Sequence, residues 1–155
     1  NATLTTPTIA SMANCTFPAG HILSAGSATV AQMSNQTGTW EASMVLGTTS
    51  GTSALTSSSN KVWIHANCRV QNRNDDQAND VNVYLSGGGL GATTSGKHFG
   101  SLGWESAQYE SECASVAVID ASPGATTPTY KIYCSATGST WHFAQIYFTY
   151  MEIKA

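Results

Sequence analysis

Histidines and acidic side chains are the residues of this chain that could hold a metal ion. The four histidines stand at positions 21, 65, 98 and 142, so no His-x-His or His-x-x-x-His pair occurs. Asp75, Asp76 and Asp80 form an acidic run, but the run lacks the glycine and the closing glutamate of a calcium-binding EF-hand loop. We therefore expect no metal and no cofactor, and we interpret the acidic run as a solvated hairpin tip.

Catalytic residues are equally hard to find. None of the 19 serines lies in a Gly-x-Ser-x-Gly elbow, the turn that exposes an activated serine. Glu110 and Glu112, near Glu105, would share one face of a strand, which fits a polar surface as well as a paired glycosidase site. Cys113 and Cys134 lie in apolar alternation, where burial raises the pKa of a thiol. We expect no enzymatic activity.

The four cysteines, Cys15, Cys68, Cys113 and Cys134, match no zinc-binding spacing. They could form two disulfides in three possible pairings, but a chain of 155 residues can bury enough surface without such links. We favour free cysteines that pack as small hydrophobic residues, with at least one disulfide as the alternative.

The overall composition combines few charges with many hydroxyls. Charged residues make up 10% of the chain, 39 residues are Ser or Thr, and 41% are hydrophobic. Soluble domains usually carry about 25% charged residues, so this surface is either hidden in an assembly or covered by hydroxyls and amides. A net charge of -3 with six scattered cations offers no basic stripe for nucleic acid. One folded domain without a membrane-spanning helix is expected.

The sequence contains short runs in which apolar and polar residues alternate, as they do in β-strands. These predicted strands would position any functional side chains. Residues 1–19 show no helical period and are interpreted as an extended leader, while residues 20–155 form the domain. Eight strands without helices predict an antiparallel sandwich of two sheets or a jelly roll. The expected strands are 21–23, 28–33, 41–46, 61–70, 81–85, 111–119, 129–136 and 141–154, the last with a break.

Two strands have informative patterns. In 61–70, Val62, Ile64 and the alternate residues after them are apolar, so one face belongs to the core. The last strand is apolar on both faces, with Ile146, Phe148 and Tyr150 on one and Tyr147, Met151 and Ile153 on the other. Because only one face of a sandwich sheet meets the core, we expect these residues to lie at an interface between subunits. The alternative is a central strand covered by loops of its own chain.

Two loops differ from the rest in composition. Residues 71–80 form a polar hairpin connection, and residues 86–108 form a long glycine-rich loop. Long irregular loops are usually functional or disordered, and this one carries aromatic side chains. The aromatic residues His98, Phe99, Trp104 and, just beyond it, Tyr109 therefore predict a functional surface. The alternative is that Trp104 and Tyr109 cap the core.

Four segments resemble, in order, the C-terminal head domains of bacteriophage tail-fibre-like proteins. They are TLTTPTIASMANCTFPAGHIL, SNKVWIHANCRV, DASPGATTPTYKIYCSATGST and YFTYMEIKA. The likeness covers most of the chain, but its motifs are short and mark the scaffold; residues 70–109 match nothing specific. The resemblance implies a jelly-roll sandwich similar to the C1q and tumour-necrosis-factor type, forming a homotrimer at the tip of a fibre.

The function that follows from the resemblance is host recognition by a virion protein assembled in the host cytoplasm. His98, Phe99, Trp104 and Tyr109 would then contact the receptor. Its partners would be other virion proteins through the N-terminal stem, and a glycan or outer-membrane component of the host surface. A purely structural virion component is the main alternative. A secreted C1q-like or lectin-type module would instead use disulfides and the glycosylation sequons at Asn1, Asn14 and Asn35. A polysaccharide depolymerase is a further alternative.

Overall fold

The structure, a computed structural model, describes residues 18–30, 39–72, 79–92, 97–104, 111–137 and 141–155. The described residues contain strands, turns and irregular segments but no helix, so no helix there could cross a membrane. The strands are β1 (Ile22–Val30), β2 (Thr39–Val45), β3 (Lys61–Asn72), β4 (Asn79–Gly87), β5 (Lys97–Trp104), β6 (Ser111–Asp120), β7 (Thr129–Thr137) and β8 (Trp141–Ile153).

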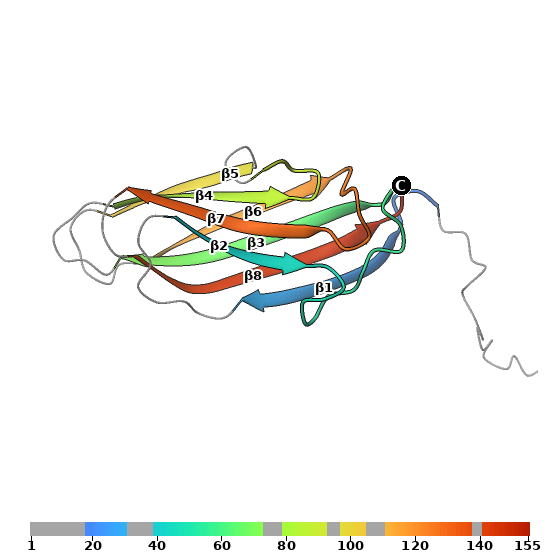
Figure 1. Cartoon of the computed structure of the whole chain (residues 1–155), viewed down its shortest axis with the longest axis horizontal. Helices are drawn as coiled ribbons and strands as arrows, with labels where there is room; N and C mark the ends of the chain where they lie inside the picture. The colour runs from blue at the N-terminus through green and yellow to red at the C-terminus, as the bar shows by residue number, and fades with distance from the viewer. Residues whose placement is uncertain (1–17, 31–38, 73–78, 93–96, 105–110, 138–140) are drawn as a thin grey trace, which may run out of the picture.

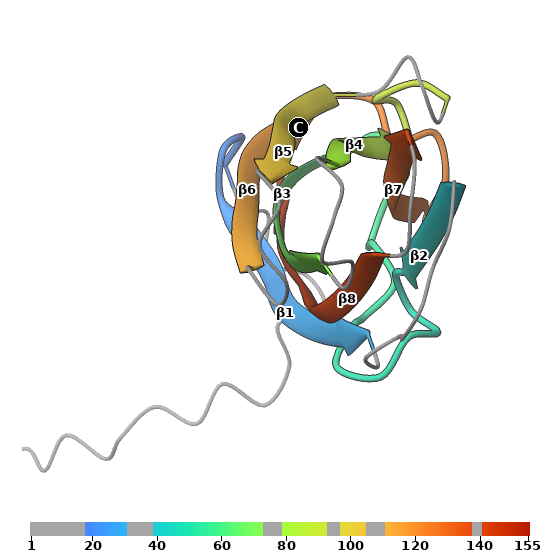
Figure 2. The same ribbon diagram turned by 90° about the vertical axis from the view of Figure 1, so that its left-hand side faces the viewer.

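The strands form two antiparallel four-stranded sheets. One has the order β1-β8-β3-β6 and the other β2-β7-β4-β5 (Figure 1). Seen along the strands, the two sheets wrap around a shared interior (Figure 2). The chain enters and leaves at one end, where the backbone N–H groups of Gly20 and Lys154 donate to the carbonyls of Lys154 and His21, both at 2.8 Å. The predicted all-β class with two antiparallel sheets is confirmed.

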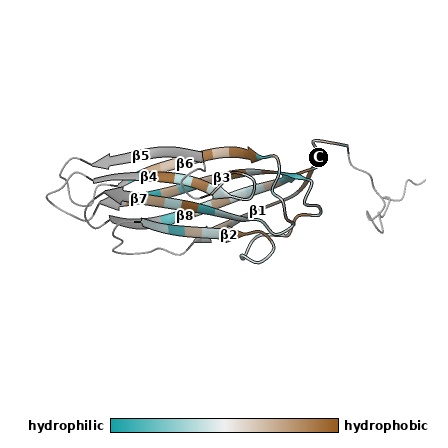
Figure 3. Ribbon diagram, turned by 45° about the horizontal axis from the view of Figure 1, so that its top comes forward, coloured by the Kyte–Doolittle hydropathy of each residue, from teal (hydrophilic) through white to brown (hydrophobic). Residues whose placement is uncertain are grey.

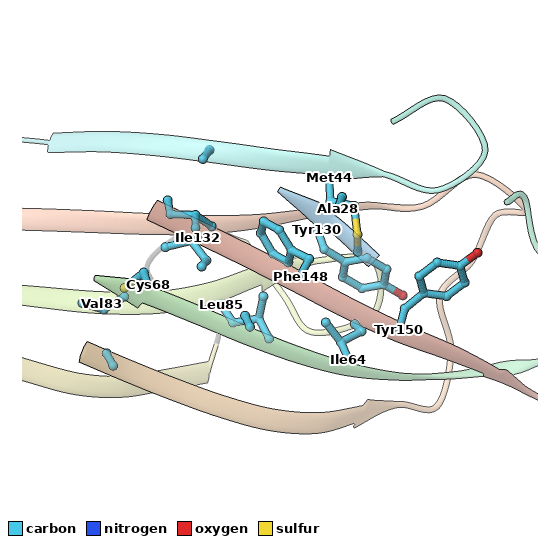
Figure 4. Packing of buried hydrophobic residues seen from close by; sticks show 14 of the residues in the cluster. Ala28, Met44, Ile64, Cys68, Val83, Leu85, Tyr130, Ile132, Phe148 and Tyr150 are labelled. Atoms are coloured by element: carbon cyan, nitrogen blue, oxygen red, sulfur yellow. The ribbon is translucent and has the colours of Figure 1, made fainter. Parts of the chain in front are cut away.

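The alternation predicted for 61–70 is confirmed in β3. Val62, Ile64, Ala66, Cys68 and Val70 are all fully buried, while the residues between them are exposed or half-buried. The inward residues of both sheets form one core in which aromatic rings from β7 and β8 lie between aliphatic side chains (Figure 4). The largest fully buried hydrophobic side chains are Tyr130, Tyr150, Phe148, Met44, Leu46, Ile64, Leu85, Ile132 and Ile146.

Three strand predictions need correction. The separate strands expected at 21–23 and from residue 28 are one strand, β1, because the small residues between them continue to pair with β8 from Ser24 to Val30. Residues 31–33 of the expected second strand lie outside the described residues. The expected loop 86–108 contains β5, which pairs with β4. The polar connection 71–80 is shorter than expected, since its first two residues belong to β3 and its last two to β4.

Candidate functional site

The predicted receptor residues fall on or beyond β5. His98, Phe99 and Trp104 belong to this strand, at the edge of the β2-β7-β4-β5 sheet, and not to an irregular loop. Tyr84 pairs with His98 and Val83 with Gly100, so Phe99 is the extra residue of a β-bulge. Tyr109 lies outside the described residues. Their role in receptor contact stays a prediction.

The predicted interface residues of β8 divide into two groups. Ile146, Phe148 and Tyr150 point into the core and are 2%, 0% and 0% exposed, so they have no surface to offer another subunit and are removed from the predicted interface. Tyr147 is 41% exposed, and Met151 and Ile153 are half-buried on the opposite face. An interface through β8 therefore rests on Tyr147, Met151 and Ile153.

The outer face of the β1-β8-β3-β6 sheet extends these three residues into a larger patch. Met151 lies opposite Trp63 of β3, which in turn lies opposite Ile119 of β6, and residues opposite each other on paired strands share a face. At the next position Ile153 lies opposite Ile22 of β1. We call this set the apolar outer face: Ile22, Trp63, Ile119, Tyr147, Met151 and Ile153.

The exposure of this face is unusual. Ile22 and Ile119 are each 54% exposed, and together with Tyr147 they are the exposed large hydrophobic residues of the described chain. Figure 3 shows the apolar composition of the C-terminal half of β6. Ile119 also lines a shallow pocket of about 250 Å³ beside Gly89, Leu90 and Ser122. Exposed apolar surface of this kind marks an interaction site. Tyr147 belongs to the same face, but Thr149 separates it from Met151 along β8.

The middle of the same face is more polar. The rings of Trp63 and His65 stack with centroids 6.1 Å apart and planes 17° apart. His65 Nε2 shares a hydrogen bond of 2.7 Å with Ser115 Oγ on β6. The outer face of this sheet is therefore apolar near the end where Gly20 and Lys154 pair. It becomes aromatic and then polar toward the middle of the strands.

The outer face of the β2-β7-β4-β5 sheet has a different character. Tyr133 of β7 lies between Glu41 of β2 and Tyr84 of β4. The two tyrosine rings are 6.1 Å apart and tilted by 50°. Lys131 Nζ forms an ion pair with Glu41 Oε1 at 2.7 Å. The sequence analysis missed these tyrosines, although the alternation in 129–136, with Tyr130 and Ile132 facing inward, would have placed Tyr133 outward.

Two buried carboxylates hold loops to the sandwich. Glu152 Oε1 accepts hydrogen bonds from Thr56 N, Thr56 Oγ1 and Asn60 Nδ2, each 2.7 Å long, and Oε2 accepts one from Ser24 Oγ. Burial raises the pKa of the Glu152 carboxyl, but the hydrogen bonds from Thr56, Asn60 and Ser24 outweigh it and lower the pKa below its ordinary value. These contacts fix the loop between β2 and β3.

The second carboxylate, Asp120, is built into the turns at the same end of the sandwich. Its Oδ2 accepts from Tyr130 Oη at 2.8 Å and from Gly89 N at 2.9 Å, and its Oδ1 accepts from Ser122 N. Burial raises the pKa of the Tyr130 hydroxyl, and the hydrogen bond and charge of Asp120 raise it further. Because both oxygens of Asp120 accept bonds from the chain itself, we assign the residue to the scaffold.

The cysteines within the described residues are free. Cys68 and Cys134 are buried, from opposite sheets, and burial raises the pKa of the Cys134 thiol, with a further rise from its hydrogen bond to Cys68. Cys113 is exposed, which corrects the expected burial of this residue, because it occupies an outward position of the edge strand β6. Cys15 lies outside the described residues.

Only some of the acidic and histidine side chains considered for catalysis or metal binding lie among the described residues. No group of three or more His, Cys, Asp or Glu side chains with metal-binding geometry occurs among those residues. Glu112 is exposed on β6, whereas Glu105, Glu110, Asp75 and Asp76 lie outside the described residues. No protein-family model matches the chain, and a search of curated proteins finds no relative.

Proposed function

We propose that this chain is the head domain of a bacteriophage fibre or spike, that it forms a homotrimer, and that it attaches the particle to a host surface. The observation that carries the proposal is the apolar outer face, because a chain with 10% charged residues also exposes two isoleucines on one sheet. An assembly that covers this face removes its apolar area from water. The resemblance to tail-fibre heads supports three copies.

The strand order supports a jelly roll as the form of the sandwich. A jelly roll distributes eight strands over two sheets through two Greek keys. In this chain β1 pairs with β8, and consecutive strands change sheet except at the β4-β5 hairpin. C1q and tumour-necrosis-factor domains, the fold type that the tail-fibre resemblance implies, use this architecture in trimers.

The direction of the chain also fits a fibre tip. The described chain begins at residue 18, beside the C-terminus, where Gly20 and Lys154 are paired. A stem before residue 20 would thus join the head at this end and leave the outer face of the β2-β7-β4-β5 sheet available for contact. Three copies on one tip would bind a repetitive host surface with higher avidity than one copy.

The assembly is tested by light scattering on the purified chain. We expect a mass near three times the 16.2 kDa of one chain. Replacing Ile119 by Asp places a charge on the apolar outer face, and because this side chain is 54% exposed the fold should tolerate it. The I119D variant should give a mass near that of one chain.

The matched control is Ser43→Asp, which adds the same charge at an exposed position of the opposite sheet and should leave the trimer mass unchanged. A wild-type mass of one chain would refute the trimer. An unchanged mass for I119D would show that the apolar outer face is not the subunit interface.

Attachment is tested with fluorescently labelled protein on a panel of bacterial strains. We expect the wild-type protein to label at least one strain, and an excess of unlabelled protein to prevent it. If no strain is labelled at saturating protein, the chain is better described as a purely structural virion component.

A further inference from the structure

The outer face of the β2-β7-β4-β5 sheet carries a cluster of side chains suited to a ligand. Tyr133 is at its centre, with Tyr84 beside it on β4 and Glu41 opposite on β2. Both tyrosines are half-buried, so each ring is held by the sheet and keeps part of its surface open. We call this set the tyrosine patch: Glu41, Asn82, Tyr84, Lys131 and Tyr133.

The charges of the tyrosine patch cancel each other. Lys131 Nζ lies 2.7 Å from Glu41 Oε1, and both side chains keep partial exposure, at 35% and 46%. Ser43 lies opposite Lys131, and Asn82 lies opposite Ser135, which adds hydroxyl and amide groups at the neighbouring positions. The patch therefore offers aromatic rings and hydrogen-bonding groups with no net charge.

This composition separates the tyrosine patch from the apolar outer face. The exposed large hydrophobic residues of the described chain, Ile22, Ile119 and Tyr147, all belong to the other sheet. Nucleic acid would require cations that are not already paired, whereas the cation of the tyrosine patch, Lys131, is paired with Glu41. The described side chains of the patch also lack the exposed aliphatic residues of the apolar outer face.

We propose that the tyrosine patch binds an uncharged sugar unit of a bacterial surface glycan. A pyranose ring has a C–H face that packs on an aromatic ring and hydroxyls at its rim that need hydrogen-bond partners. Tyrosine combines an apolar ring with a polar tip, and the Glu41–Lys131 pair and Asn82 supply acceptors and donors beside it. This inference rests on the proposed function and names the class of ligand.

The sequence-predicted receptor strand lies next to the patch. The backbone of β5 pairs with that of β4 so that His98 is opposite Tyr84. The strand that carries His98, Phe99 and Trp104 therefore borders the tyrosine patch, and a glycan longer than one unit would extend along this edge of the sheet.

The test uses an array of immobilised bacterial oligosaccharides, with neutral hexoses, deoxyhexoses and N-acetylhexosamines in one group and uronic acids in another. We expect the wild-type protein to bind at least one neutral glycan. Tyr84→Ala and Tyr133→Ala should each weaken binding by about tenfold, which corresponds to the loss of one aromatic contact. Tyr84→Phe and Tyr133→Phe should keep most of the binding because they retain the ring.

Thr127→Ala, a change at an exposed loop position between β6 and β7, is the control and should bind as the wild type does. Each variant is first checked for an unchanged oligomer mass and melting temperature. The inference is overturned if no neutral glycan is bound, if only uronic-acid glycans are bound, or if the alanine variants bind as tightly as the wild type.

Labelling of whole bacteria separates this inference from the proposed function. If the wild-type protein and both alanine variants label the same strain equally, attachment stands and the tyrosine patch is not its site. If the wild-type protein labels no strain, the attachment function itself fails.

Discussion

Glu152 shows how hydrogen bonds from neutral groups can hold a charged residue inside a sandwich. The carboxylate is 0% exposed, and its four hydrogen bonds come from the hydroxyls, amide and backbone of Ser24, Thr56 and Asn60. A buried charge is costly unless hydrogen bonds replace its hydration. The hydroxyl-rich composition of the chain therefore supports its core as well as its surface.

We predict that Glu152→Gln lowers the free energy of unfolding at pH 7 by about 2 to 3 kcal/mol, because hydrogen bonds to a charged group are stronger and an amide cannot accept on both sides. Ser24→Ala removes only one of the bonds and should cost about 1 kcal/mol. Urea denaturation measures both. Equal losses in the two variants would contradict a role for the charge.

The pH dependence of stability provides a second test of Glu152. The pKa of this carboxyl is lowered in the folded protein from its ordinary value of 4.5, through hydrogen bonds that outweigh burial. The folded state thus binds a proton less readily than the unfolded state. The stabilisation is fully present above pH 4.5 and is lost as the pH falls through the lower folded-state pKa. In Glu152→Gln this loss should be smaller, as urea denaturation from pH 7 to pH 3 would show.

At the scale of the strand, the two-residue period of the sequence predicted those strands that alternate apolar and polar residues. β3 alternates bulky apolar residues with polar ones, so its residues and its buried face were predictable. β1 contains a run of Ser, Ala and Gly, which have little strand preference of their own, and its continuity comes from pairing with β8. β5 has two glycines in eight residues, and glycine has little strand preference, so this strand was not predicted from the sequence.

The turn between β4 and β5 illustrates a contact that periodicity cannot predict. Gly88 has a φ of 52°, and a Cβ at this position would meet Asp120 Oδ2 and would lie 2.7 Å from the Tyr130 ring. The absent side chain thus allows the turn to approach the Asp120 carboxylate. Only the folded structure brings these three residues, from the β4–β5 turn, β6 and β7, together.

We predict that Gly88→Ala destabilises the domain by about 2 to 3 kcal/mol, since it combines a positive φ with a steric clash. Gly124→Ala is the matched control, because Gly124 has a φ of 76° and its Cβ would meet nothing within 4 Å. The control should cost about 1 kcal/mol, the backbone contribution alone. Thermal unfolding of the two variants measures the difference, and equal losses would refute a tight contact with Asp120.

At the scale of the whole molecule, the two outer faces divide the surface into different chemistries. The sequence predicted that β8 is apolar on both sides, but it could not tell which side meets the core of its own chain. The structure assigns Ile146, Phe148 and Tyr150 to the core and leaves Tyr147, Met151 and Ile153 outside. The tyrosine patch was not predicted, because its residues come from three strands whose register only the fold determines.

If further copies of the chain cover the apolar outer face, folding and association are linked. A partner that binds only the folded state stabilises it by mass action, so the melting temperature should rise with protein concentration. We predict a measurable rise for the wild type when the concentration increases on the order of a hundredfold, and no rise for Ile119→Asp. Differential scanning calorimetry at matched scan rates measures both proteins, with Ser43→Asp as the control that should follow the wild type. A wild-type melting temperature that does not depend on concentration would mean that subunit contact contributes nothing to folding, and the exposed Ile22 and Ile119 would then require a different partner.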